Sequence, residues 1–432
     1  MSFDFELPHG WRWETIETLK ASGRSIVSGP FGSNIGKRFF VDNGVPVVRG
    51  NNLSLGMERF NDDGFVFLTE EKAAEFKSCE AHPNDLLFTA AGTIGQVGIV
   101  PPRPRYPKYI ISNKQLRARL DPEQIQPLFA YYWLASPPMV EMIQSRNTGS
   151  TIPLINLSVL KSLPVPVPPI EVQKAIVDIL SVLDDRITLL RETNATLEAI
   201  AQALFKSWFV DFDPVRAKQE GRAPDGMDEA TAALFPDSFE ESELGLVPIG
   251  WQLSSLHQLC NISSGKRPND RSDVQTSIDS IPLFGGAGIM GFTKDALFDT
   301  PKILTGRVGT LGKIHIAYPP FWASDNVLVL SPIESRSFYF CFHWINSIDV
   351  HSLNRGSTQP LLTQRDLGNQ GHVIPPVKLL EAFAEIAQPL YEKSRANAQQ
   401  AQTLATLRDT LLPRLISGQL RLPDAEAVLA GI

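Results

Sequence analysis

The chain has 432 residues, enough for two or three domains of ordinary size. Its hydrophobic content of 43% is ordinary for a globular protein, and no stretch has the length and apolarity of a transmembrane helix. The first residues lack a signal-peptide pattern, and Cys79, Cys260 and Cys341 lack the spacing of a zinc site or a disulfide framework. The composition therefore predicts a cytoplasmic protein without a structural metal.

The formal net charge of −7 is concentrated in one segment. Between Asp211 and Pro248 there are ten acidic and three basic residues, so this segment carries the whole net charge and the rest of the chain is neutral. A neutral body can still present local basic surfaces, so the overall charge does not exclude a nucleic-acid partner.

Residues 1–160 form the first predicted globular part. Short runs of β-forming residues, such as VPVVRG, GFVFLT and DLLFTA, alternate with Gly, Pro and Asn. This punctuation predicts a small, irregular sheet with few helices. Near the end of this part, the run 128–144 predicts a helix interrupted at Pro137 and Pro138.

Residues 161–210 contain a predicted long helix whose apolar positions recur in alternating steps of four and three. This heptad seam is typical of a coiled coil, and at about 1.5 Å per residue it spans roughly 50 Å. A buried Asn at the position of Asn194 commonly sets the register of two helices; the alternative is a long helix whose Asn faces water. The seam positions are Ile176, Leu180, Leu183, Ile187, Leu190, Asn194, Leu197, Ala201, Leu204 and Trp208.

The acidic segment 211–248 is interpreted as a solvated connector rather than a domain. Residues 249–366 form a second, shorter globular part, 367–420 a second long helix, and 421–432 a C-terminal tail.

The second helix has a weaker seam than the first. Ser394, Asn397 and Arg408 lie at or beside its seam positions, and Pro389 and Pro413 are expected to bend or end the helix. Its apolar seam positions are Phe383, Leu390, Leu404 and Leu411. A weak seam is easiest to understand if its partner is the strong seam of the first helix.

The chain contains an internal repeat. NTGSTIPL at 147–154 recurs 207 residues later as NRGSTQPL at 354–361, and GTIGQVG at 92–98 resembles GRVGTLG at 306–312. The chain is thus predicted to be a tandem duplication, in which each unit is a globular part followed by a long helix. The two helices are expected to pack as an antiparallel pair, with the units related by a pseudo-twofold axis.

The motifs of common catalytic and cofactor sites are missing from the sequence. GTIGQVG and LFGGAGIMG (283–291) superficially resemble phosphate and S-adenosylmethionine loops, but neither precedes a helix, so a hairpin is favoured for the first. There is no GxxxxGK[ST] loop, no Asn/Asp-Pro-Pro-Tyr/Phe motif, no GxSxG and no HExxH. The sequence therefore predicts binding rather than catalysis, with no catalytic and no metal-ligating residue.

The clearest binding feature is PPRPRYPKYIISNKQLRAR at 101–119, which has six basic residues, two interleaved tyrosines and no acidic residue. Arg and Lys bind phosphates, and Arg can read guanine edges with two hydrogen bonds. A solvated basic face is the alternative for this stretch and for every other candidate. The candidate DNA-binding residues are Lys37, Arg38, Arg49, Arg103, Arg105, Lys108, Lys114, Arg117, Arg119, Arg146, Lys266, Arg267, Arg271, Arg307, Lys313 and Arg355.

The whole layout resembles the specificity (S) subunits of type I restriction–modification systems. The resemblance covers nearly the whole chain, and its motifs are quite specific in combination. They are LFKSWFVDFDPVRAK (204–218), LFPDSFEESELGLVPIGW (234–251), the two GST loops followed by VPPIEVQKAIVDIL and IPPVKLLEAFAEI, and LLPRLISGQL (411–420).

The resemblance implies an α+β fold, with two target-recognition domains that have small irregular sheets, joined by two long helices packed as an antiparallel coiled coil. Each domain would read one half of a split double-stranded DNA site, and the helices would act as a ruler. Two methyltransferase (M) subunits and two restriction/translocase (R) subunits would join the assembly. S-adenosylmethionine, ATP and Mg²⁺ would be bound by those partners and not by this chain.

We therefore expect a cytoplasmic, non-catalytic DNA-specificity subunit that directs adenine methylation or cleavage by its partners. One alternative is a coiled-coil scaffold that binds proteins without sequence-specific DNA binding. A second alternative, an enzyme with its own methyltransferase or nuclease activity, is disfavoured by the missing motifs. Recognition domains of this family differ widely, so the resemblance assigns no base-contacting residue.

Overall fold

The computed structural model describes residues 6–243, 245–356 and 358–430. The chain divides into two compact units. Unit 1 comprises residues 1–190 and 399–432, and unit 2 comprises residues 191–398. Each unit contains one globular part and one part of each long helix. Among the described residues, no helix combines the length and apolarity needed to cross a membrane.

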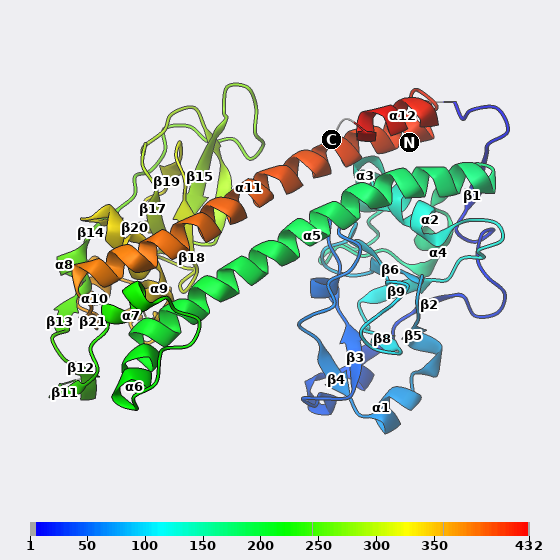
Figure 1. Ribbon diagram of the computed structural model, residues 1–432. Helices are drawn as coiled ribbons and strands as arrows, with labels where there is room; N and C mark the ends of the chain where they lie inside the picture. Colours follow the sequence, from blue (N-terminus) through cyan, green and yellow to red (C-terminus); the bar gives the residue numbers. More distant parts are fainter. Residues whose placement is uncertain (1–5, 244, 357, 431–432) are drawn as a thin grey trace. The chain divides into compact units, whose positions relative to one another are not determined.

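The globular part of unit 1 is built on two small four-stranded sheets (Figure 1). The first has the order β2-β9-β6-β7, with the bounds Ile26–Ser28, Gln115–Ala118, Leu86–Thr89 and Val97–Ile99. The second has the order β4-β3-β8-β5, with the bounds Val66–Leu68, Val45–Val48, Tyr109–Ile111 and Glu80–Ala81. Strands β3, β6 and β9 are buried along their whole length, which is why two of them appear as continuous apolar runs.

A third, two-stranded sheet joins the start of this globular part to the segment before the first long helix. It pairs β1 (Arg12–Thr15) with β10 (Pro164–Val167) in antiparallel fashion. The short helices of unit 1 are α1 (Glu70–Ala74), α2 (Pro127–Leu134), α3 (Pro137–Ser145), α4 (Leu157–Lys161) and α12 (Leu422–Ala430). The predicted interruption at Pro137 and Pro138 is confirmed, since α3 begins there.

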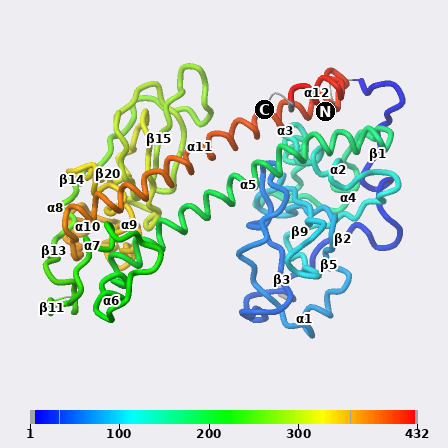
Figure 2. The backbone as a smooth tube through the Cα atoms, viewed as in Figure 1, coloured from blue at the N-terminus to red at the C-terminus, as the bar shows by residue number. Residues whose placement is uncertain are grey.

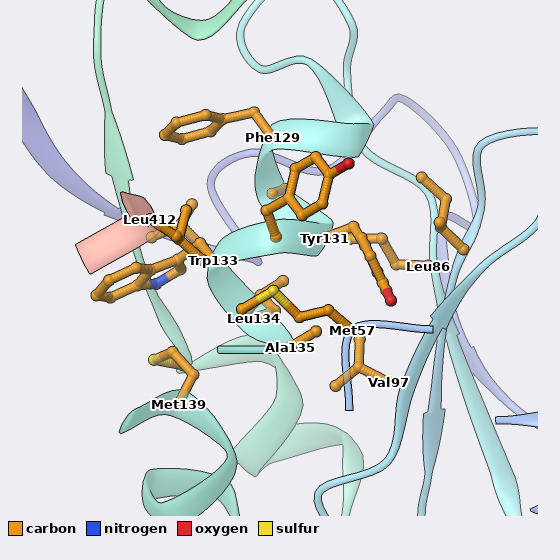
Figure 3. Close-up of a cluster of buried hydrophobic side chains, with 14 of the residues drawn as sticks. Met57, Leu86, Val97, Phe129, Tyr131, Trp133, Leu134, Ala135, Met139 and Leu412 are labelled. Carbon is orange, nitrogen blue, oxygen red and sulfur yellow. The ribbon is translucent and has the colours of Figure 1, made fainter. Parts of the chain in front are cut away.

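Helix α2 forms the centre of the unit 1 core. Its residues from Phe129 to Leu134 are all buried, and this uniform apolarity places it between two layers. Figure 3 shows Trp133 beside Leu412 of the second long helix, whereas Leu86 and Val97 of the sheet lie on the other side of α2. The globular part of unit 1 is therefore packed onto the long helices through α2.

The globular part of unit 2 repeats this architecture. Its four-stranded sheet has the order β14-β20-β17-β18, with the bounds Cys260–Ser264, Val327–Pro332, Lys302–Gly306 and Ile314–Ala317. A three-stranded sheet β16-β15-β19 has the bounds Gly288–Thr293, Ile281–Gly285 and Trp322–Ala323. The antiparallel pair of β13 (Gln252–Ser255) and β21 (Gly371–Ile374) corresponds to β1 and β10. The helices of this part are α8 (Leu256–Leu259), α9 (Phe338–Ser347) and α10 (Gln364–Gly368).

The predicted long helices are present as α5 (Ile170–Phe209) and α11 (Val377–Ile416), each 40 residues long. Figures 1 and 2 trace both helices, and the buried clusters of each unit show that they pack together there. In unit 1, Ile176, Leu180, Leu183, Ile187 and Leu190 of α5 share a buried cluster with Leu404 and Leu411 of α11. In unit 2, Leu204 and Trp208 of α5 share one with Phe383 of α11. Because the C-terminal part of α5 meets the N-terminal part of α11, the helices are antiparallel.

The seam of α5 contains the predicted polar residue. In unit 2, the Asn194 amide donates to the carbonyl oxygen of Ser394 at 2.9 Å, and Asn397 donates to Asn194 Oδ1 at 2.9 Å. Leu197 and Leu390 are half-buried beside this pair. Asn194 thus faces α11, and the water-facing alternative is excluded.

Of the two expected effects of Pro389 and Pro413, a bend or an end of the second helix, the end is wrong, because α11 continues through both, and the bend stays a prediction. Both prolines lie on the exposed side of the helix. The carbonyl group four residues earlier loses its amide partner at each proline, but water can hydrogen-bond it there.

The acidic segment is more ordered than a solvated connector. It contains α6 (Asp213–Gln219), α7 (Glu229–Ala233) and an antiparallel hairpin of β11 (Phe239–Ser242) and β12 (Gly245–Pro248). Val215, Phe235 and Val247 from this segment are buried in the core of unit 2. A few buried apolar side chains thus pack the segment against unit 2, while its acidic residues face solvent.

Candidate nucleic-acid interface

The first GST loop is closed by the side chain of its leading asparagine. Asn147 Oδ1 accepts hydrogen bonds from the backbone amides of Gly149 and Leu154, both at 2.8 Å. A Cβ atom on Gly149 would lie 1.9 Å from the carbonyl oxygen of Ile152, so only glycine fits. The motif therefore specifies a loop shape.

The second GST loop has the same construction. Asn354 Oδ1 accepts from the amides of Gly356 and Leu361, both at 2.9 Å. A Cβ atom on Gly356 would lie 1.8 Å from the carbonyl oxygen of Gln359. The repeated sequence thus corresponds to a repeated structure.

A glycine turn packs against each GST loop. In unit 1 the amide of Gly92 donates to Pro153 at 2.9 Å, and in unit 2 the amide of Gly309 donates to Pro360 at 3.0 Å. The hairpin interpretation of GTIGQVG is confirmed, because β6 and β7 pair in antiparallel fashion across this turn. These contacts also correct the sequence match: Gly92 corresponds to Gly309, three residues beyond the Gly306 of the motif comparison.

In each unit, the residues that follow one strand complete the edge formed by the GST loop and the glycine turn. This strand is β2 in unit 1 and β14 in unit 2. Gly29, after β2, donates to Gln115, and Gly265, after β14, donates to Val327, both at 3.0 Å. A Cβ atom on Gly29 would lie 1.8 Å from the carbonyl oxygen of Ser112, and one on Gly265 would lie 2.3 Å from that of Ala323. Both glycines are therefore required by a close backbone approach.

These segments define a corresponding edge in each unit. Tip 1 comprises residues 29–32, 90–95, 112–114 and 147–154. Tip 2 comprises the described residues 265–268, 307–312, 324–326, 354–356 and 358–361. Backbone hydrogen bonds connect the turns within each tip. The amide of Ala90 donates to the carbonyl oxygen of Lys114 at 2.7 Å, and the amide of Arg307 donates to that of Asn326 at 2.8 Å.

Besides Arg355, which pairs with Asp366, tip 2 contains three of the predicted basic residues. Lys266 and Arg267 follow Gly265 and are exposed, and Arg307 begins the neighbouring glycine turn. In tip 1, Lys114 is exposed. Within the described ranges, none of these four side chains forms a salt bridge. Their charges are therefore directed to solvent rather than to acidic neighbours.

Two predicted basic residues are part of the protein interior. Arg117 is 4% exposed and donates to the backbone carbonyl groups of Glu80 and Arg24, both at 2.7 Å. Arg119 binds both carboxylate oxygens of buried Asp85 at 2.7 Å. We remove Arg117 and Arg119 from the candidate DNA contacts, since their donors are used inside unit 1.

Four further candidates have partners at the surface. Arg105 contacts Asp63 at 3.2 Å, and Lys108 contacts Glu70 at 3.0 Å. Arg146 donates to the Ser162 hydroxyl at 3.1 Å, and Arg355 binds the Asp366 carboxylate at 2.8 Å. The Arg355 guanidinium lowers the pKa of Asp366, so this pair is ionised at neutral pH.

The remaining candidates lie at several other places. Lys37 and Arg38 are exposed on a short 3₁₀ helix, Arg103 and Lys313 are exposed, and Arg271 pairs with Asp273 at 2.8 Å. Arg49 is half-buried and donates to the carbonyl of Gly64 at 3.1 Å. The basic stretch 101–119 is thus not one continuous surface.

Sequence reasoning missed two residues near these candidates. Lys72 lies over the ring of Phe39 at 4.0 Å from its centroid, and Arg38 lies over the same ring at 4.6 Å. Phe31 is 84% exposed in tip 1. No pattern in the sequence marks either residue, because both depend on how distant segments meet.

A buried ionic cluster attaches the globular part of unit 1 to its long helices. Asp184 of α5 accepts from Arg408 of α11 at 2.5 Å, from Tyr132 of α2 at 2.8 Å and from Arg59 at 3.2 Å. Burial and the Asp184 carboxylate raise the pKa of the Tyr132 phenol, so the hydroxyl stays protonated and donates. Asp184, Tyr132, Arg59 and Arg408 form what we call joint 1.

The corresponding positions of unit 2 are different. His343 precedes Trp344 as Tyr132 precedes Trp133, and Tyr391 lies 207 residues after Asp184. His343 Nε2 and the Tyr391 hydroxyl are 3.0 Å apart, and burial lowers the pKa of His343 to about 4, so the imidazole is neutral. Beside this pair, which we call joint 2, there is a cavity of about 620 Å³ whose lining includes Tyr318, Phe342 and Arg395.

Within the ranges that the structure describes, no group of three or more His, Cys, Asp or Glu side chains has an arrangement that could hold a metal ion.

The corresponding features of the two units are loops, turns and basic side chains at one edge. That arrangement can bind an extended polyanion, because exposed Lys and Arg bind phosphates and backbone turns permit close approach.

The family is shown by direct comparison. The family model described as "Type I restriction modification DNA specificity domain" matches residues 37–199 and 248–405. The two matches cover most of the chain, including most of the first globular part and the second globular part. The chain therefore belongs to this family, and it is a specificity subunit of a type I restriction–modification system, a non-catalytic subunit.

Two relatives illustrate the similarity over most of each chain. The specificity subunit of the type I restriction enzyme MjaIX from Methanocaldococcus jannaschii is 26% identical over 378 residues, 82% of each chain. That of HindI from Haemophilus influenzae is 26% identical over 375 residues, 72% of this chain and 81% of the relative.

The fold is shared with a crystal structure of the type I S subunit from M. genitalium. The TM-score is 0.54 at 19% identity, with 96% of this chain and 97% of the other covered. The expected α+β fold with a duplicated recognition domain and paired long helices is thus confirmed.

Proposed function

We propose that this chain binds a bipartite double-stranded DNA target, with one recognition unit for each half-site, and directs adenine methylation or cleavage by partner subunits. The observation that carries the proposal is the pair of tips. Their backbone frameworks share the hydrogen bonds described above, whereas their side chains differ. A shared framework with different side chains is what two readers of two different half-sites require.

The charge pattern supports DNA as the ligand. Lys266, Arg267 and Arg307 gather at tip 2, and Lys114 lies at tip 1, although the overall charge is negative. The negative charge resides mainly in residues 211–248, away from the tip segments in sequence. Local basic edges on an acidic chain favour a polyanionic ligand at those edges.

The long helices supply a surface for the methyltransferase partners. Outside the seam, Val182 and Leu189 are 59% and 51% exposed and lie one heptad apart on α5. Ile200 of α5 and Ile386 of α11 are 48% and 41% exposed. Exposed apolar positions on a helix favour docking of a protein partner. We propose that two M and two R subunits assemble with the chain and bind S-adenosylmethionine, ATP and Mg²⁺.

The proposal is tested by a methylation map. The chain is expressed with its methyltransferase subunit, and host DNA is sequenced by a method that detects N6-methyladenine. We expect a split motif of two short defined blocks around an unspecified gap. A continuous motif would contradict the two-unit arrangement, and absence of methylation with a folded partner would favour the scaffold alternative.

A further inference from the structure

Phe31 is exposed in a way that folding alone does not explain. Its side chain is 84% exposed, the largest value among the exposed large hydrophobic residues of the described chain. It lies in tip 1, where the side-chain amide of Asn113 donates to the carbonyl oxygen of Gly32, the residue after Phe31, at 3.2 Å. An aromatic ring held in water at the end of a strand loses the stabilisation that burial would provide.

The duplication identifies the corresponding residue of unit 2. Ser28 and Ser264 pair with Leu116 and Leu328 in the two sheets, and the following glycine makes the same 3.0 Å hydrogen bond in each unit. Counting two residues beyond that glycine gives Phe31 in tip 1 and Arg267 in tip 2. Both side chains are exposed.

The surroundings of these two residues also differ between the tips. Pro30 corresponds to Lys266, and Ala90 corresponds to Arg307 through their matching hydrogen bonds to Lys114 and Asn326. The fixed part of each tip is therefore the backbone, and the variable part is the side chains that it presents. Tip 1 presents an apolar ring where tip 2 presents a guanidinium group.

We propose that Phe31 and Arg267 are equivalent base-contacting residues, Phe31 as an apolar wedge at a base step of one half-site and Arg267 as a hydrogen-bond donor to a base edge of the other. This inference rests on the proposed function and assigns it to side chains. A ring without hydrogen-bonding groups recognises DNA by stacking on a base or entering a base step. A guanidinium group donates two hydrogen bonds to guanine O6 and N7.

The experiment uses the chain assembled with its methyltransferase subunit and duplexes carrying the mapped target. F31A is compared with F31W, which keeps an aromatic ring, and with L246A, which removes an apolar side chain that is 61% exposed outside the tips. We expect F31A to bind about 10- to 100-fold more weakly, whereas F31W and L246A bind within a few-fold of the unaltered chain.

A second readout reports the wedge directly. 2-Aminopurine is placed at each position of both half-sites in turn, and its fluorescence rises where stacking is lost. We expect one position to brighten on binding and F31A to abolish that change. For unit 2, R267A should lose discrimination at one base pair of the other half-site by about 10- to 100-fold, whereas R222A in the acidic segment should not.

The outcomes separate the inference from the function on which it rests. If F31A and R267A retain the affinity, the 2-aminopurine signal and the methylation motif of the unaltered complex, the inference is wrong while the function stands. If both variants affect the same half-site, the equivalence of the tips is wrong. If the unaltered complex binds no DNA selectively, the proposed function fails and the inference fails with it.

Discussion

Single residues decide how the two long helices are aligned. Asn194 and Asn397 hydrogen-bond across the seam of unit 2, and Asn194 also uses the backbone of Ser394. In a register shifted by one heptad these amides would lie opposite apolar side chains and lose their partners. A buried polar pair of this kind specifies register at some cost in stability.

Replacing Asn194 with Val should lower the free energy of unfolding by about 1–3 kcal/mol, because the Asn397 amide, which is 2% exposed, is left without its partner. The double variant N194V/N397V should recover that loss, since both amides are then absent. Urea unfolding of the full chain measures both effects. Equal stability of the single variant and the unaltered chain would show that the pair contributes nothing.

His343 makes the stability of unit 2 depend on pH. Its pKa falls from 6.5 to about 4 on burial, so the unfolded chain binds more protons than the folded chain between these values. The neutral His343 side chain therefore makes its full contribution to folding stability above pH 6.5, and this contribution is lost as the pH falls toward 4. The full effect of one such group is about 3 kcal/mol.

The variant H343Y, which introduces the residue type found at the corresponding place of unit 1, should flatten this dependence. Unfolding free energies at pH 7.5 and pH 5.0 measure the difference between the two chains. His315 and His372, whose pKa values are also lowered by burial, should leave a residual slope in both. An identical slope in H343Y and the unaltered chain would contradict the assignment.

At the scale of elements, the two units attach their globular parts to the helices by different chemistry. Joint 1 is ionic and lies among α2, α5 and α11, whereas joint 2 is a neutral pair beside a cavity. Ala201 of α5 lies 207 residues before Arg408, so the second guanidinium of joint 1 has no counterpart in joint 2. Buried charges require their partners more strictly than neutral groups do.

Breaking joint 1 should therefore be costly. D184N should lower the free energy of unfolding by about 3–5 kcal/mol, because Arg408 loses its buried counterion and keeps only Asp409, whose side chain is 42% exposed. Y391F in joint 2 should cost no more than about 1–3 kcal/mol, since it removes one neutral hydrogen bond. Denaturant unfolding of both variants gives the comparison, and equal losses would mean that joint 1 is not held by charge.

At the scale of the whole molecule, the net charge of the chain and the local charge at the tips are separate properties. The acidic segment accounts for the negative total, while unpaired basic side chains gather at the tips. DNA binding depends on the local charge, because each neutralised phosphate releases counterions. The salt dependence of binding therefore tests which residues face the DNA.

The triple variant K266A/R267A/R307A should reduce the slope of log K against log salt by up to about 3, at roughly 0.9 for each phosphate contact removed. The double variant R12A/R222A removes exposed charge outside the tips and should leave the slope unchanged. Filter binding or anisotropy of the assembled complex between low and moderate salt measures both. An unchanged slope in the triple variant would direct attention to Lys37, Arg38 and Lys72 instead.

The sequence by itself determined the duplication, the antiparallel helices, the family and the seam, including Asn194. These properties follow from local periodicity and from repeated motifs, which a linear chain displays directly. The sequence did not determine that the second helix continues through its two prolines. The free-energy cost of a proline in a helix depends on whether the carbonyl group that loses its partner faces water.

Only the tertiary structure decided what each polar residue does. Arg117 and Arg267 are both basic residues that the sequence marks as candidates. Arg117 donates to a backbone carbonyl group inside unit 1, whereas the Arg267 side chain is exposed at tip 2. Tip 1 arises where segments near residues 29, 90, 113 and 150 meet, and joint 1 arises where Asp184 and Arg408, 224 residues apart, form an ion pair. Such meetings depend on packing and desolvation across the whole unit, which no local pattern records.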